Sequence, residues 1–461
     1  MGLPARPPTV RPPEPFHFPT PQVVELGDGL QALLLEDHRL PLVHLQLVVR
    51  AGLSAEPPEE AGVAYACASM IDEGAGSRSA LQLAAAVQQI GAGLWLWTGW
   101  DSSNLSLQVL HQHLDAALAL LADVLLRPHF DAEEWRRVRE EIRGRGLQRR
   151  AEPTESASLG LSRLVYGGHP YSRPLLPMPD EVMALKLPAV RRFHQAYYRR
   201  DRATVVVAGD LTPAELQDKL GRRLEGWRGR TTASAPRPGV PPRPRGRRLG
   251  LVDRPGAPQS AVRVGHLCPP RRELDWAAVK LLNTVLGGSF TSRLNLNLRE
   301  RNGFTYGIGS SFHLTRGPTL LKISTSVATE DTAASLREIL SELDQLRQVP
   351  VKKAELGKAQ RLVVESLPAE AETLEDLTEE YGGLVVHELP LDTITRLPEQ
   401  VAAVSPARLQ QWAQQLLQPE RATLVVVGDA TRLRAELGEL VEEVIVLDED
   451  GRPAAARRSR T

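Results

Sequence analysis

The sequence predicts an α+β protein built from two similar domains, and three observations support this fold class. The segment "DRATVVVAGDLTPAEL" (201–216) recurs as "ERATLVVVGDATRLRAEL" (420–437), and each copy reads as a buried strand, a Gly-Asp turn and a helix. A helix with similar spacing precedes each copy, from Pro188 and from Pro406. Alternating apolar segments between long helical patterns are typical of antiparallel strands. We therefore expect two homologous domains, each an antiparallel sheet with helices packed on one face.

The individual elements follow from their periodicity. In the first half, "LVHLQLVVRAG" (42–52) and "NLSLQVL" (104–110) alternate like half-buried strands, and leucines recur on one helix face over 114–125. In the second half, "LLKISTSV" alternates in the same way. Long helical patterns follow it at 331–347 and 351–380.

A stretch without any period separates the halves. "RGRTTASAPRPGVPPRPRGRR" is rich in Pro, Arg and Gly, which predicts an exposed linker. The expected divisions are a disordered Pro-rich arm at 1–17, an N-terminal domain at 18–227, the linker at 228–248, a C-terminal domain at 249–450 and a disordered tail at 451–461.

Composition excludes several classes of protein. The formal net charge is zero, so no overall field recruits nucleic acid, and we expect no nucleic-acid partner. Two cysteines, Cys67 and Cys268, are too few for a disulfide scaffold or a thiolate metal cluster. No apolar run approaches 18 residues, so we expect no membrane insertion. The N-terminus lacks a signal-peptide core, which favours the cytoplasm, although a misassigned start codon would leave the periplasm open.

Four segments share their order and spacing with a known family. They are "RLPLVHLQLVVRAGLSAEPPEEAGVAY", "DAALALLADVLLRPHFDAEEWRRVREEI", "RATVVVAGDLTP" and "VLGGSFTSRLNLNLRERNGFTYGIGSS". Together they resemble the insulinase (pitrilysin) zinc peptidases, specifically the short branch that includes mitochondrial processing peptidase and its bacterial relatives. The resemblance covers residues 18 to 450. It implies two similar α+β domains that form half of a clamshell, which closes around an unfolded peptide.

The zinc motif of that family is missing here. Active members carry H-x-x-E-H on a helix, because two histidines four residues apart share one face and the glutamate between them activates water. In "GVAYACASM" the corresponding positions hold Tyr65, Ala68 and Ser69. A phenol and an alcohol are poor zinc ligands, and an alanine cannot act as a base. We therefore expect no metal in this chain.

The more distant carboxylate of the motif survives. In "EEWRRVREEI", Glu134 and Glu141 share a helix face, and Glu141 matches the third zinc ligand of the family. One carboxylate does not hold a catalytic zinc, so we interpret both as solvated helix charges. Cys67 lies off the face of the motif and is expected to be a buried, inert thiol.

A second family motif is intact. The pattern R-x-x-x-G-x-x-Y is met by Arg299, Gly303 and Tyr306 in "LRERNGFTYGIG". The resemblance implies that this arginine and tyrosine reach a zinc site and hydrogen-bond the substrate near its developing oxyanion. The alternative is that Arg299 caps a helix and Tyr306 packs in a sheet. The zinc residues are missing while the Arg299 and Tyr306 pair is intact, and this contrast favours the functional interpretation.

The segment "GLWLWTGWD" matches the edge strand that pairs with substrate in active members. Its candidate substrate-binding residues, together with Gly303 of the second motif, are Leu94, Trp95, Leu96, Trp97 and Thr98. The tryptophans are bulky for this role, and the favoured alternative is that they fill the vacated cleft.

The leading hypothesis is a non-catalytic subunit of a heterodimeric zinc metalloendopeptidase. Its homologous partner would carry the intact H-x-x-E-H motif and the zinc, and this chain would supply Arg299 and Tyr306 for cleavage of a peptide substrate. The alternative is an inactive structural or peptide-binding scaffold subunit.

Overall fold

The computed structural model describes residues 16–227, 229 and 240–454 of the chain. Nearly all of the arm predicted at 1–17, most of the linker predicted at 228–248, and residues 455–461 of the predicted tail lie outside these residues.

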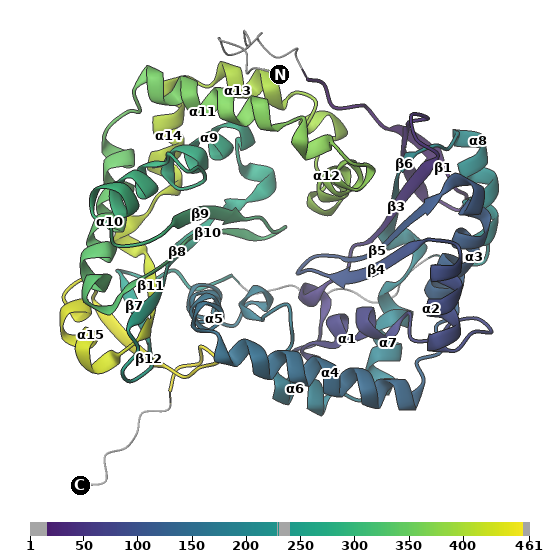
Figure 1. Cartoon of the computed structure of the whole chain (residues 1–461), viewed down its shortest axis with the longest axis horizontal. Helices are drawn as coiled ribbons and strands as arrows, with labels where there is room; N and C mark the ends of the chain where they lie inside the picture. Colours follow the sequence, from purple (N-terminus) through teal and green to yellow (C-terminus); the bar gives the residue numbers. More distant parts are fainter. Residues whose placement is uncertain (1–15, 228, 230–239, 455–461) are drawn as a thin grey trace, which may run out of the picture.

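Within the described residues the chain forms two six-stranded sheets, one in each half (Figure 1). The N-terminal sheet has the order β1-β2-β6-β3-β5-β4. The bounds of its strands are β1 Gln22–Glu25, β2 Gln31–Glu36, β3 Leu42–Val49, β4 Gly93–Thr98, β5 Ser103–Leu110 and β6 Ala203–Gly209.

The C-terminal sheet repeats this plan, with the order β12-β7-β11-β8-β10-β9. Its strands are β7 Arg248–Asp253, β8 Gln259–Pro270, β9 Ile308–His313, β10 Pro318–Ala328, β11 Thr423–Gly428 and β12 Glu443–Leu447. The repeated segments become β6 and β11, which hold the same place in the two sheets. The predicted α+β fold of two homologous halves is therefore confirmed.

The sheets themselves are mixed, which corrects the expectation of purely antiparallel sheets. Strand β2 pairs in parallel with β6, and β7 pairs in parallel with both β11 and β12. The central strands β3, β5, β8 and β10 remain antiparallel. Parallel pairing arises because β6 and β11 return to their sheets after several helices, and β12 follows after α15.

The helices of the N-terminal half are α1 Val63–Met70, α2 Ala80–Gln89, α3 Leu114–Leu126, α4 Ala132–Ala151, α5 Pro153–Tyr166, α6 Pro179–Ala184, α7 Leu187–Tyr197 and α8 Pro213–Leu216. Those of the C-terminal half are α9 Trp276–Leu286, α10 Thr332–Gln348, α11 Lys353–Ser366, α12 Leu374–His387, α13 Leu397–Ala403, α14 Pro406–Leu416 and α15 Ala430–Gly438.

The helical pattern at 351–380 forms two helices rather than one. Helix α11 ends at Ser366, and Pro368 follows. Thr373 then caps α12, since its side chain accepts from the Asp376 amide while the Asp376 carboxylate accepts from the Thr373 amide. The proline and the capping box together explain the break.

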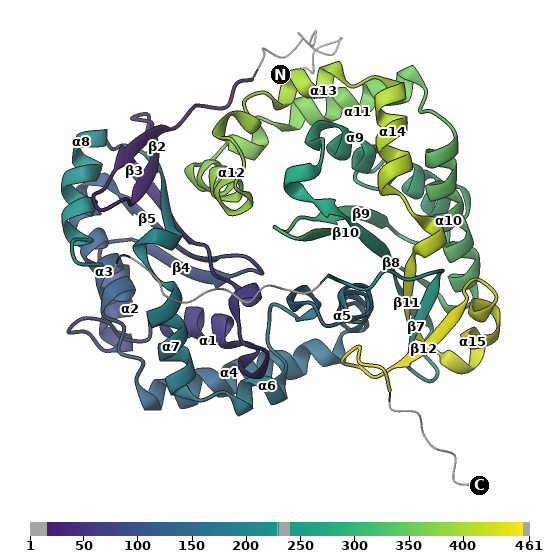
Figure 2. The ribbon, with the colours of Figure 1, turned by 180° about the vertical axis from the view of Figure 1, so that it is seen from behind.

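One helix from each half packs on the sheet of the other half. Helix α5 packs on β8 and β11, and α12 packs on β3 and β6. Both views show α12 beside the N-terminal sheet and α5 beside the C-terminal sheet (Figures 1 and 2). Helices therefore cover both faces of the sheets, in contrast to the predicted single covered face. This explains why every residue of β11 is buried although a half-exposed strand would alternate.

The two halves are further joined at the end of the chain. Residues 451–454 were predicted to begin a disordered tail, but Pro453 forms a bridge to Leu447 of β12. Gly451 packs against Gly160 of α5, and the carboxylate of Asp450 accepts two hydrogen bonds from Arg150 at 2.7 and 2.8 Å. The prediction failed because the contacts with α4 and α5 join residues about 300 positions apart, as the Arg150–Asp450 pair does.

Candidate functional site

Helix α1 carries the three positions of the missing zinc motif. It begins at Gly62, whose φ of 87° suits glycine. The buried Glu56 carboxylate accepts hydrogen bonds from the amides of Gly62 and Ala64, at 3.0 and 2.9 Å. Tyr65 and Ser69 lie on one partly exposed face of α1, with Ala68 beside them. The side chains of Tyr65 and Ser69 therefore stand where α1 is partly open to solvent.

Arginines occupy the surroundings of the surviving carboxylates. Arg145 pairs with Glu141, and its guanidinium lies 3.4 Å from the Tyr65 hydroxyl. Contact with Tyr65 and then with Glu141 raises the pKa of Arg145. The two arginine neighbours of Glu141, Arg145 and Arg137, stand four residues after it and four before it on α4.

Arg137 forms ion pairs with three carboxylates. It lies 2.5 Å from Glu73, 2.9 Å from Glu134 and 3.5 Å from Glu141. Contacts with Glu73, the strongest, and with Glu134 raise the pKa of Arg137. Glu134 and Glu141 are therefore paired helix charges, and the expectation of merely solvated charges was incomplete.

A cavity of about 190 Å³ lies beside Ala68 and Ser69. It is lined by Asp72, Glu73 and Glu141, by Leu96 of β4, and by Arg145. Burial, with a smaller contribution from Glu73, raises the pKa of Asp72 to about 6.

The residues of this cavity do not fit a zinc ion. Positions 65 and 69 offer a phenol and an alcohol, and arginines pair with two of the three carboxylates of the cavity, Arg137 with Glu73 and Arg145 with Glu141. Among the described residues, no group of three or more His, Cys, Asp or Glu side chains is arranged to hold a metal ion. Cys67 is buried and lies off this face, and burial raises the pKa of its thiol well above the usual value.

The second motif lies in the C-terminal half, at the start of β9. Arg299 falls in a π-helical turn, Asn295–Arg301, and Gly303 adopts a φ of +66° just after it. Tyr306 lies two residues before the start of β9, and it is 97% exposed. Tyr306 therefore does not pack in a sheet, and the structural alternative for this residue is wrong.

Arg299 is held by an aromatic ring rather than by a helix cap. Its guanidinium lies 4.3 Å above the ring of Phe290, which is itself 67% exposed. Its nearest carboxylate is that of Glu300, at 3.6 Å. The motif thus holds a guanidinium stacked on an aromatic ring and, seven residues later, an exposed phenol.

Strand β4 is the edge of the N-terminal sheet and pairs only with β5 among the described strands. The edge of β4 that faces away from β5 is therefore open to a further strand, and it is formed by Leu94, Trp95, Leu96, Trp97 and Thr98. Trp95 is 49% exposed, so it does not fill the vacated cleft, as the favoured alternative required. Leu96 is the residue of β4 that lines that cavity.

Two family models match the chain next to each other. The model described as insulinase (Peptidase family M16) matches residues 32–178, and the model described as the Peptidase M16 inactive domain matches residues 184–363. The chain belongs to the M16 peptidase family. The resemblance inferred from the sequence motifs is thereby confirmed.

Relatives of this chain carry names both of zinc proteases and of a non-peptidase homolog. An uncharacterized zinc protease of Mycobacterium tuberculosis (strain ATCC 25618 / H37Rv) is 28% identical over 356 residues, which are 76% of this chain and 80% of that protein. A non-peptidase homolog of Helicobacter pylori (strain ATCC 700392 / 26695) is 23% identical over 377 residues, covering 80% of this chain and 85% of its own length.

The M16 fold is also seen in solved structures. A peptidase M16 inactive domain from Pseudomonas fluorescens has a TM-score of 0.82 at 23% identity, over 89% of this chain and 98% of that chain. At this identity the match supports the fold alone.

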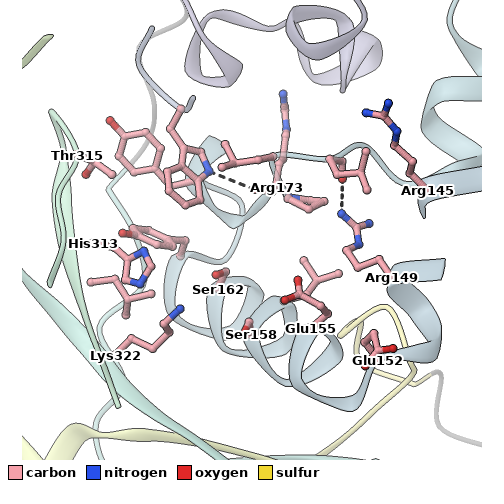
Figure 3. Close-up of a pocket in the computed structure, with 18 of the residues that line it drawn as sticks. Arg145, Arg149, Glu152, Glu155, Ser158, Ser162, Arg173, His313, Thr315 and Lys322 are labelled. Atoms are coloured by element: carbon pink, nitrogen blue, oxygen red, sulfur yellow. Dashed lines mark hydrogen bonds between the residues drawn. The ribbon is translucent and has the colours of Figure 1, made fainter. Parts of the chain in front are cut away.

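One larger cavity of this M16 chain was not predicted from the sequence. It has a volume of about 860 Å³ and lies where α4 and α5 of the N-terminal half meet β9 and β10 of the C-terminal half (Figure 3). Arg145 lines both this junction cavity and the vacated metal cavity, so the two spaces are neighbours. No feature of the sequence could predict the junction cavity. Its walls come from segments that meet only because α5 packs on the C-terminal sheet.

None of the helices in the described ranges is both long enough and apolar enough to cross a membrane.

Proposed function

We propose that this chain is the zinc-less subunit of a two-chain M16 endopeptidase. Its homologous partner would carry the H-x-x-E-H motif and the zinc, and the two chains would close around a peptide as the halves of a clamshell. This chain would supply Arg299 and Tyr306 to the partner's site.

The observation that carries this proposal is the contrast between the two motifs. At the first motif, the positions of the ligands and the base hold Tyr65, Ala68 and Ser69, and arginines neutralise the remaining carboxylates. At the second, Tyr306 is almost fully exposed although a phenol of this size is usually packed. A chain that has lost its own metal chemistry still presents the donor pair.

The chemistry of the pair suits a developing oxyanion. The phenol can donate one hydrogen bond and the guanidinium several, and stacking on Phe290 limits the freedom of Arg299. A preorganised donor of this kind is worth about 3–4 kcal/mol in a closed site. The similarity to a protein called a non-peptidase homolog also supports a role without an active centre of its own.

The test is reconstitution with a homologous chain that carries H-x-x-E-H. Each chain is assayed for peptide cleavage alone and mixed, and the complex is followed by size-exclusion chromatography. We expect cleavage only by the mixture. Tyr306→Phe should lower kcat of the complex by roughly 10²–10³-fold with little change in KM, because the lost hydrogen bond belongs to the transition state.

Tyr65→Phe is the matched control, since it removes the other phenol, at the vacated metal position, and should leave kcat unchanged. If the folded Tyr306→Phe complex keeps full activity, the pair has no catalytic role. The alternative of a structural or peptide-binding scaffold would then be favoured. It would also be favoured if the complex binds peptides and no mixture of the two chains cleaves them.

A further inference from the structure

The junction cavity combines apolar walls with buried positive charge. Its apolar lining is formed by Trp100, Leu159, Tyr166, Tyr171, Pro174, Leu175, Leu176 and Leu320. Figure 3 shows His313 and Lys322, from the C-terminal sheet, facing Ser158 and Ser162 of α5 across this space. Its volume of about 860 Å³ falls within the range of about 300–1,000 Å³ that small-ligand sites occupy.

One carboxylate influences three cationic groups around this cavity, of which Arg149 is also influenced by Asp450 and Glu181. Lys322 and Arg149 line it, and Arg263 lies behind the wall, where it donates to the Ser158 hydroxyl at 3.0 Å. Glu155 is the acidic side chain that influences all three. Among the described residues, none of the three forms a salt bridge of 4.0 Å or less, whereas the other cations of the lining, Arg145 and Arg173, are paired with Glu141 and Glu56.

The surroundings of Lys322 disfavour its charged form. Burial is the main cause that lowers the pKa of Lys322, and the charge of Arg263 adds to it, while Glu155 opposes the shift. The second acidic residue of the lining, Glu152, is exposed and is not among the causes of the Lys322 shift. An additional negative charge next to Lys322 would therefore be stabilised.

We propose that the junction cavity binds a ligand with an apolar body and a single carboxylate. The carboxylate would pair with Lys322 and accept a hydrogen bond from His313, and the body would lie against the apolar wall formed by Leu159, Tyr166 and Leu320. The C-terminal residue of a peptide with a large apolar side chain has this chemistry, and so does a medium-chain fatty acid.

His313 fits this role because it adds no competing charge. Burial lowers its pKa to about 4, so the imidazole is neutral at pH 7 and can donate from one ring nitrogen. Arg149 donates to the Leu176 carbonyl and the Met178 sulfur, and Arg145 and Arg173 are paired with carboxylates. The Lys322 ammonium and the neutral imidazole are therefore the donors left for a ligand, and they suit a monoanion better than a phosphate.

The site needs neither a metal nor a partner chain, so it is tested on the full chain alone. The probe is a fluorescein-labelled hexapeptide that ends in Phe with a free carboxylate, and its C-terminal amide is the comparison. Binding is followed by fluorescence anisotropy. We expect the acid to bind roughly 10–100-fold more tightly than the amide, because one charge-assisted hydrogen bond distinguishes them.

Lys322→Met removes the ammonium and keeps the length of the side chain, so it should abolish the preference for the acid. Lys353→Met, an exposed lysine at the start of α11, is the matched control and should change nothing. Ser162→Trp should block the cavity without altering its charge, and it preserves the test if the Lys322 variant does not fold.

Decanoate distinguishes the two sources of this chemistry. If it displaces the peptide from wild type and not from Lys322→Met, a free fatty acid and a peptide C-terminus both fit the site. If it fails to displace the peptide, the site is specific for a peptide end. Equal binding of acid and amide by wild type, or an unchanged preference in Lys322→Met, would overturn the proposal.

Discussion

The phenol of Tyr65 accepts a hydrogen bond from the guanidinium of Arg145, with 3.4 Å between oxygen and nitrogen. Tyr65 stands at the first histidine position of the M16 zinc motif, and Arg145 also pairs with Glu141, at the third ligand position. A fixed positive charge therefore lies among the former ligands. Restoring the ligands without removing this charge should give an incomplete metal site.

Metal binding provides the first prediction. The variant Tyr65→His, Ala68→Glu, Ser69→His should bind zinc weakly, because Arg145 and Arg137 repel a divalent cation. Adding Arg145→Gln to the three changes should tighten zinc binding by about tenfold or more. The measurement is competition with a chromogenic chelator.

The control for the zinc experiment is Arg143→Gln in the same triple background. Arg143 lies on α4 and pairs with Glu140, away from the cavity. If removal of Arg145 and of Arg143 had the same effect, the change would reflect overall charge. The idea of a guanidinium at the vacated site would then be wrong.

Phe290 provides the second prediction, on activity of a reconstituted complex. Phe290→Leu removes the ring under the Arg299 guanidinium and leaves an apolar side chain in place. We expect KM to rise and kcat to fall by several-fold, because a cation–π contact at an exposed site is worth about 0.5–1 kcal/mol. Since Phe290 is 67% exposed, the midpoint of thermal unfolding should not change. A large loss of stability would contradict a purely positioning role.

His44 provides the third prediction, on the pH dependence of stability. Its two ring nitrogens lie 2.8 Å from the Ser106 hydroxyl and 2.7 Å from the Thr378 hydroxyl, so it joins β3 to the exchanged helix α12. Burial lowers its pKa to about 4, whereas an unfolded histidine titrates near 6.5. As the pH falls from about 6.5 to 4, the unfolded chain binds the proton first, and stability is lost.

The expected contribution of His44 is about 2–3 kcal/mol between those pH values. Other buried histidines act in the same direction, and Glu56, whose pKa burial raises to about 7, acts in the opposite direction. The informative quantity is therefore the difference between wild type and His44→Gln in urea unfolding at several pH values. The variant should show a flatter dependence, and His129→Gln, at an exposed position, should not.

Gly451 provides the fourth prediction, on the contact between the chain end and α5. It has a φ of +70°, and a Cβ there would lie 2.6 Å from the Gly160 backbone. Gly451→Ala should therefore combine left-handed strain with a clash and cost about 3 kcal/mol of unfolding free energy. Gly256→Ala is a matched control, because Gly256 has a φ of +72° and open space around it, and it should cost only about 1 kcal/mol. Equal losses would mean that the chain end does not pack on α5 in solution.

Much of this protein was determined by local sequence. The repeated Val-rich strand before a Gly-Asp turn predicted β6 and β11 and the duplication, because burial of such strands leaves few alternatives. The spacing of Arg299, Gly303 and Tyr306, and the absence of histidines around Ala68, were visible in the sequence. Each of these motifs lies within a short run of consecutive residues. The arginines four residues on either side of Glu141 also carried a readable signal, which was overlooked.

The tertiary structure alone decided how the two halves are joined. The crossing of α5 and α12, the parallel strand pairs and the junction cavity depend on contacts between residues hundreds of positions apart, such as His44 with Thr378. Periodicity reports that a face is apolar and cannot report which sheet will cover it. For the same reason the exposure of Tyr306 and the lone carboxylate facing Lys322 became visible only once both halves were folded together.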